Sequence, residues 1–227
     1  MGHQGDFEGL QERLRASGLR ILHSGMPTAD WPEPPHKIQS VLIIGHAGGE
    51  FWPYFSSSAE YKDGQPNPLD RWSARVIGAA APGLAFASPN DGPPYPPIHA
   101  LTRGGALHPS LLGMLVHSDF GLWTAVRGLL LCADPLPYSD TTQAPGAQDF
   151  ADCIKACPVS AFSTAGYDAA ACAQHLLHDR QAPCWQGCLV RKAYPPGAAY
   201  AYGPDQAKFY MDAFTAAFAA NLQDTGS

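Results

Sequence analysis

Proline and glycine occupy 45 of the 227 positions, with 22 prolines and 23 glycines. Proline breaks helices and glycine weakens both helices and strands, so such a chain needs many turns and long connections. This composition disfavours a helical bundle. The two residue types follow no fixed repeat, which argues against collagen and against a solenoid. The apolar share is ordinary for a globular protein, and we therefore expect an α+β fold with its own core.

Apolar periodicity predicts three helices and several short strands. The helices are expected over residues 6–16, 68–81 and 204–221, and two buried strands over 40–44 and 84–88. Residues 113–117 and 122–132 are the strongest strand candidates, and the short link that contains Gly121 predicts a β-hairpin between them. Residues 89–97 include five prolines and are expected to be irregular.

The charge and hydropathy of the chain exclude several classes of partner. The net charge is −6 and the sequence has no basic block, so nucleic acid is not an expected partner. No apolar stretch is long enough to span a membrane. The polar first fifteen residues lack the apolar segment of a secretory signal, which predicts a cytoplasmic protein with reduced cysteines.

A polar stretch over residues 135–146 divides the chain by composition, and five of the six cysteines follow it. We predict a core domain over residues 1–134 and a smaller cysteine-containing, helical region over 135–227. Cys132 precedes the division, next to three leucines, and is expected to be part of the core.

The cysteine region contains the end of a ferredoxin-type motif. Cys153 and Cys157-Pro158 fit the last part of the run C-x₂-C-x₂-C-x₃-C-P, whose thiolates bind iron–sulfur clusters. The earlier cysteines of the run are missing. Cys172 stands alone, and Cys184 and Cys188 follow it.

Three interpretations of the cysteines remain open at this point. One irregular [4Fe–4S] cluster would need about four thiolates around one site, and its candidate ligands are Cys153, Cys157, Cys184 and Cys188. A zinc site would use Cys153, Cys157, Cys184 and Cys188. Without a metal, the cysteines would pack as small apolar side chains.

Residues 117–128 form the most distinctive stretch of the chain. They read His-x-x-Phe-Gly-x-Trp-x-Ala-x-Arg-Gly and precede an apolar strand. This pattern resembles the cblC-type vitamin B12 processing family, as do residues 41–44 and 67–70 more faintly. The resemblance implies a nitroreductase-like fold, with a central antiparallel or mixed sheet flanked by helices. It also implies removal of the upper cobalamin ligand, with a flavin or glutathione.

The resemblance suggests roles for individual residues. It implies that His117 contacts the corrin ring, while Phe120, Gly121 and Trp123 form a wall for the flat macrocycle. Arg127 would pair with a propionamide or a phosphate, or brace the strand. His108 is a further candidate for the same pocket because it lies close in the sequence.

The second half of the chain is similar to another group. Epoxyqueuosine reductases and reductive dehalogenases combine a cobalamin-binding module with a ferredoxin-like part, in the same order as here. Their resemblance implies base-off cobalamin and one [4Fe–4S] cluster, with free flavin as an alternative electron donor. Asp119 is the one acidic residue of the turn that could serve as a proton donor, and no catalytic residue is assigned.

These patterns favour a cobalamin-binding protein for reductive processing or trafficking of the cofactor. It would be either a cobalamin-dependent oxidoreductase or a carrier. Its partners would be the corrinoid and a reductase or cobalamin-dependent enzyme. Two alternatives remain open: an iron–sulfur electron-transfer protein without a corrinoid, and a degenerate scaffold without catalysis.

Overall fold

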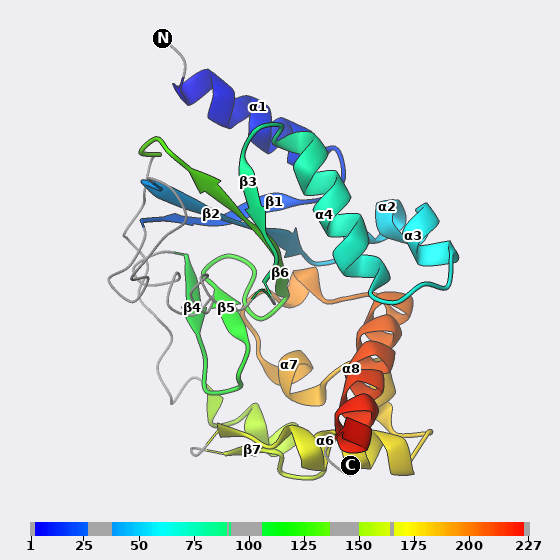
Figure 1. Cartoon of the computed structure of the whole chain (residues 1–227). Helices are drawn as coiled ribbons and strands as arrows, with labels where there is room; N and C mark the ends of the chain where they lie inside the picture. The colour runs from blue at the N-terminus through cyan, green and yellow to red at the C-terminus, as the bar shows by residue number, and fades with distance from the viewer. Residues whose placement is uncertain are drawn as a thin grey trace.

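A four-stranded antiparallel sheet forms the centre of the fold, with the strand order β1-β2-β6-β3 (Figure 1). The computed structural model describes residues 3–26, 38–89, 91, 106–136, 150–163 and 166–224. The sheet strands are β1 (Arg20–Gly25), β2 (Ser40–Ala47), β3 (Ala85–Ala87) and β6 (Thr124–Cys132). Most of the predicted irregular loop at 89–97 and of the polar stretch at 135–146 lies outside the described residues.

Helices cover one face of this sheet. They are α1 (His3–Arg15), α2 (Trp52–Ser56), α3 (Ala59–Lys62) and α4 (Pro68–Ala80). Side chains alternate between the two faces of a strand, so Leu42, Ile44 and Leu130 pack against Leu14 and Trp72 on this side. Val41 and Ile43 point to the other face, so β2 is buried along its whole length.

The opposite face of the sheet packs against a small hairpin of β4 (Leu107–Pro109) and β5 (Leu115–His117). Leu107 and Leu115 contact the apolar cluster that contains Ile43 and Leu129. The prediction that residues 113–117 and 122–132 form a hairpin is therefore wrong. β5 pairs with β4, and the two edges of β6 are taken by β2 and β3.

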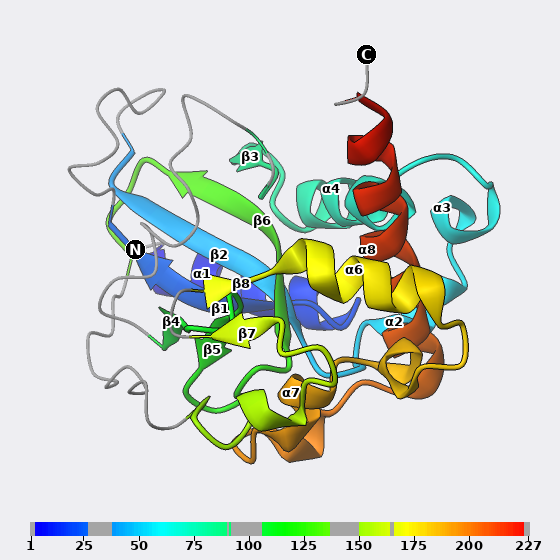
Figure 2. The ribbon, with the colours of Figure 1, turned by 90° about the horizontal axis from the view of Figure 1, so that it is seen from below.

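The C-terminal part is mainly helical and packs below the sheet in the view of Figure 1. Its elements are η2 (Ile154–Ala156), β7 (Phe162–Ser163), β8 (Gly166–Tyr167), α6 (Ala169–His178), η3 (Pro183–Gln186), α7 (Leu189–Ala193), η4 (Ala198–Tyr200) and α8 (Pro204–Asp224). Seen from below, α6 lies against α8 (Figure 2). A third apolar cluster joins this part to the preceding one, since Leu112 and Leu122 pack with Phe150, Val190 and Tyr194.

The three predicted helices are confirmed as α1, α4 and α8, with small differences at their ends. Strand β2 runs past its predicted end at residue 44 and includes Gly45 and His46. A Cβ at Gly45 would overlap the carbonyl oxygen of Ala125, so glycine allows the strands to approach there. The described sheets are all antiparallel, and the structure is an α+β fold. Within the described residues, no helix is long and apolar enough to span a membrane.

Candidate functional site

Strand β6 contains an extra residue, Arg127, opposite β2. Ile44 pairs with Gly128, whereas the next residue, Gly45, pairs with Val126. Such a β-bulge redirects a side chain and is frequent next to functional sites. The Arg127 side chain is 11% exposed and forms an ion pair with Asp70. The bulge therefore places a largely buried cation of the central sheet at the first turn of α4.

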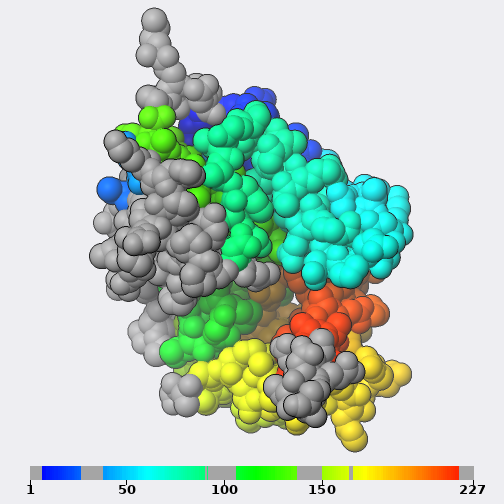
Figure 3. Space-filling view, in the orientation of Figure 1, coloured from blue at the N-terminus to red at the C-terminus, as the bar shows by residue number. Residues whose placement is uncertain are grey.

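An open hollow of about 720 Å³ lies beside this ion pair, between α4, β6 and α8. Figure 3 shows it at the boundary between the surfaces of α4 and α8. Its volume falls in the range of small-molecule sites, roughly 300–1,000 Å³. On α8, Ala213, Ala216 and Ala217 line it at helical spacing, and Phe209, Tyr210 and Asp212 of the same helix line it as well. Arg127 and Asp70 supply charge on the opposite side.

Asn67 closes the hollow at the start of α4, and its backbone is left-handed, with φ 52° and ψ 48°. This conformation costs roughly 1–2 kcal/mol for an L-residue, less for asparagine. Strain of this kind persists where the surrounding structure over-determines it, often at binding sites. The structure thus brings residues 67–70 and Arg127, which lie far apart in the sequence, to one hollow.

Arg127 also has an unused hydrogen-bond donor. Its Nε is buried, and among the described residues it has no hydrogen-bond partner. A buried donor without an acceptor costs about 1–3 kcal/mol. An acceptor atom of a ligand in the hollow would remove that cost.

His117 and Phe120 line a different, smaller pocket of about 220 Å³. The backbone N–H of Asp119 donates to Nδ1 of His117 at 3.0 Å, so the neutral ring carries its proton on Nε2. Burial lowers the pKa of His117 below its usual value, and Asp119 partly opposes this. The Phe120 ring contacts His117 at 4.4 Å and the Arg20 guanidinium at 4.8 Å between centres.

His108 is buried on β4, and burial lowers its pKa. In the β4–β5 register, His108 pairs with Val116 and Leu107 pairs with His117. Neighbouring residues of a strand point to opposite faces. His108 therefore lies on the other face of the hairpin from His117.

Gly121 has a positive φ of 56°, and its backbone touches a segment of the C-terminal part. A Cβ at this position would overlap the carbonyl oxygen of Pro196 and approach the nitrogen of Gly197. The close approach that requires glycine is therefore to the chain's own backbone.

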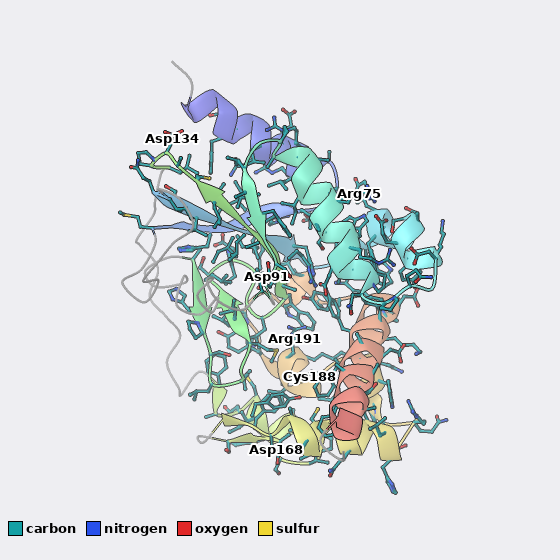
Figure 4. The ribbon with its side chains drawn as sticks, viewed as in Figure 1. Arg75, Asp91, Asp134, Asp168, Cys188 and Arg191 are labelled. Atoms are coloured by element: carbon teal, nitrogen blue, oxygen red, sulfur yellow. The ribbon has the colours of Figure 1, made fainter. Side chains whose placement is uncertain are left out.

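Trp123 is 4% exposed and lies in a cluster of polar aromatic side chains. Its ring meets Tyr202 edge-on at 5.2 Å, and the Arg191 guanidinium lies 5.6 Å from it and 5.1 Å from Tyr202. Trp123 Nε1, Arg191 Nε and the Tyr202 hydroxyl are buried with no hydrogen-bond partner in the described part of the chain. Arg191 lies near the centre of the molecule, with Cys188 next to it in the view of Figure 4.

The six residues predicted to contact cobalamin therefore do not form one continuous wall. Arg127 faces the large hollow, His117 and Phe120 line the smaller pocket, and Trp123 packs with Arg191. The roles assigned to the individual residues remain predictions. Arg127 is the one of the six that lines the hollow of small-molecule size.

The sequence did not reveal a buried polar pair between His46 of β2 and Tyr210 of α8. His46 Nδ1 lies 3.1 Å from the carbonyl oxygen of Gly48, and its Nε2 lies 2.7 Å from the Tyr210 hydroxyl. The carbonyl can only accept, so Nδ1 carries the proton and Nε2 accepts from Tyr210. Burial lowers the pKa of His46 well below 6.5. The sequence feature that could have indicated this pair is a histidine shortly after the predicted apolar strand at 40–44.

The cysteines fall into three groups. Cys132 is buried in the main core, as predicted. Cys153 packs in the third apolar cluster, where its thiol donates to the carbonyl oxygen of Ala193 at 3.5 Å. The remaining four cysteines line a single cavity: Cys157, Cys172, Cys184 and Cys188.

These four thiols are close enough to affect one another. Burial raises the pKa of Cys184, and Cys188, Cys172 and Cys157 raise it further. Burial also raises the pKa of Cys172, with additional contributions from Cys188 and Cys157. Across the described residues, no three His, Cys, Asp or Glu side chains are grouped so as to hold one metal ion. The metal site predicted from Cys153, Cys157, Cys184 and Cys188, for zinc or for an iron–sulfur cluster, therefore has no support as a set, because Cys153 does not line the cavity that the other three line.

No protein-family model and no curated protein matches the sequence. Among solved structures, the chain is similar to the crystal structure of a C. elegans B12-trafficking protein, CblC, described as a homologue of human MMACHC. The two are 12% identical, the match covers 92% of each chain, and the TM-score is 0.47. Values this low do not assign the chain to that protein's family.

Proposed function

We propose that this protein binds cobalamin in the hollow between α4, β6 and α8, for processing or trafficking of the cofactor. One observation carries the proposal. The segments that resemble the cblC-type family, residues 67–70 and the Arg127 end of the 117–128 motif, lie far apart in the sequence and line the same hollow. A shared ligand would account for their meeting.

The chemistry of the hollow suits a flat macrocycle with amide side chains. The three alanines of α8 give a small apolar surface, bordered by Phe209 and Tyr210, against which a corrin face could lie. Arg127 lines the hollow, and its guanidinium would donate to a propionamide oxygen or a phosphate. Asp70 holds the guanidinium in place through the ion pair.

His117 and Phe120 would contact the periphery of a large ligand from their own pocket. Both ring nitrogens of His117 have backbone partners, Asp119 and Leu22, so the ring would contact the ligand by packing and would not bind the cobalt ion. Reductive removal of the upper ligand, with free flavin as electron donor, belongs to the same proposal. Processing and trafficking both begin with binding, which is therefore the step to test.

The experiment is a cobalamin titration followed by visible spectroscopy, with the cofactor at fixed concentration. We expect the wild-type protein to shift the spectrum to the base-off form. Ala213→Trp places a large ring on the exposed wall of the hollow and should weaken binding at least tenfold. Ala79→Trp is the matched control, since Ala79 is an exposed alanine of α4 outside the hollow. An unchanged spectrum at saturating wild-type protein, or equal weakening by both variants, would refute the proposal.

A further inference from the structure

The cavity that contains four cysteines is distinct from the hollow and has a volume of about 260 Å³. Its thiols come from four separate places in the chain. Cys157 follows η2, Cys172 is in α6, Cys184 is in η3 and Cys188 precedes α7. Apart from the thiols, the lining is mainly aliphatic and aromatic, including Leu112.

Ordinary packing does not explain this arrangement. The cavity is partly open to solvent, whereas side chains in protein interiors are close-packed. Cysteines that serve as small apolar side chains fill space, as Cys132 and Cys153 do at 5% and 2% exposure. Cys157, Cys172 and Cys188 also contact the third apolar cluster, but they are only partly buried and border the cavity.

Two residues that line the cavity each contain a buried nitrogen with no hydrogen-bond partner among the described residues. His175 lies one turn after Cys172 on the same face of α6. Its Nε2 and the Nε of Arg191 are buried, and neither has a hydrogen-bond partner among the residues described. A bound group that reached either nitrogen with an acceptor atom would supply the missing partner. The positive charge of Arg191, next to Cys188, also suits a negatively charged group.

A single metal ion does not fit these thiols. Four sulfurs around one zinc ion lie about 2.3 Å from the metal, which requires them to be gathered at one point. No such group of three exists in the described part of the chain. Thiols that surround a cavity instead match a polynuclear soft-metal group, in which each thiolate binds a different metal atom.

We propose that Cys157, Cys172, Cys184 and Cys188 together bind one [4Fe–4S] cluster in this cavity. The inference is independent of cobalamin binding. It replaces Cys153 by Cys172 in the ligand set, although Cys153 and Cys157 stand together in the sequence motif. The spacing alone favours Cys153, whereas the structure places its thiol against Ala193 in a packed cluster. His175 would donate a hydrogen bond to a sulfur of the bound cluster.

The test is anaerobic purification and reconstitution of the full chain with ferrous iron and sulfide. We expect about four iron and four sulfide per chain, with a visible absorption that dithionite bleaches. Cys172→Ser should lose at least half of the bound iron. Cys153→Ser, the matched control from the same region, should keep it. A wild-type chain that retains no iron, or retains one zinc ion, would overturn the inference, as would equal loss in the two variants.

A second measurement addresses the case in which Cys172→Ser fails to fold. In the wild-type chain, cluster binding should protect Cys157, Cys172 and Cys188 from alkylation, as read by peptide mass spectrometry. Reconstituted protein that contains iron but leaves these thiols as reactive as before contradicts the ligand set. Cobalamin titration of Cys172→Ser separates the two proposals, since loss of the cluster should leave the hollow intact.

Discussion

The pair between His46 and Tyr210 provides a test of the buried polar contacts of the site. Tyr210→Phe removes the donor and leaves His46 Nε2 buried without a partner, which costs about 1–3 kcal/mol. His46→Phe removes the acceptor and should cost a similar amount, while the ring keeps its stacking on Phe51, now 3.9 Å between centroids. Gly48 keeps a second donor, since Gln206 Nε2 also reaches its carbonyl oxygen at 3.1 Å.

Replacing both partners of a hydrogen bond by apolar groups of the same shape is often nearly neutral. We therefore expect the double variant, His46→Phe with Tyr210→Phe, to lose less free energy of unfolding than the two single variants together. The coupling should be about 1–2 kcal/mol, as for residues in direct contact. Urea unfolding of the four proteins at pH 7.5 gives the complete cycle. Additive losses, within about 0.5 kcal/mol, would refute the assignment of this hydrogen bond.

The same histidine predicts a pH dependence. Burial keeps the pKa of His46 in the folded protein well below 6.5, so the unfolded chain binds a proton first as pH falls. His46 thus destabilises the fold by up to about 1.4 kcal/mol per pH unit below 6.5, until its folded pKa is reached. The stability advantage of wild type over His46→Phe should shrink by about 1.4 kcal/mol between pH 7.5 and pH 5.5. An advantage that stays constant would contradict a buried neutral His46.

Two further predictions concern other parts of the chain. Gly121→Ala should lower stability by more than about 2 kcal/mol, because positive φ and overlap with Pro196 act together. Gly83→Ala, also at positive φ but with open space around it, should cost only about 1 kcal/mol, and thermal unfolding compares the two. Glu60 should titrate at about 2 in NMR, because the hydrogen bond from Arg75 lowers its pKa from 4.5. Arg75→Ala should return that pKa to its ordinary range, and an unchanged value would refute the pairing.

The sequence predicted the helices better than the strand pairing. Helices α1, α4 and α8 follow from local periodicity and from the proline that opens α4, which need no information about distant contacts. The partner of a strand depends on which distant edges are free. The short link before β6 predicted that β5 would pair with it. The strand that pairs there is β2, although some eighty positions separate β2 from β6 in the sequence. Local turn signals cannot show which of several strands pairs with a given edge.

The candidate site was predictable only in part. The motif drew attention to Arg127, and the structure places Arg127 beside a hollow. The bulge that directs it depends on pairing with Gly45, which no local pattern reveals. The sequence also could not show that Cys172 lines the cysteine cavity and Cys153 does not. Cysteine spacing reports only positions along the chain, whereas four separate segments form the cavity. His46 and Tyr210 lie 164 positions apart in the sequence and form a hydrogen bond in the fold.

Helix α8 separates the two proposed sites, and this gives each an independent test. Ala213 and Ala217 face the hollow, whereas Met211 and Phe214 line the cysteine cavity. Substitutions on one face should therefore affect one ligand only: Ala213→Trp should spare iron binding, and Cys172→Ser should spare cobalamin binding. Tyr210 lines both spaces, so its removal alone is expected to disturb both. If Ala213→Trp abolished iron binding while the chain stayed folded, the two spaces would have to act as one site.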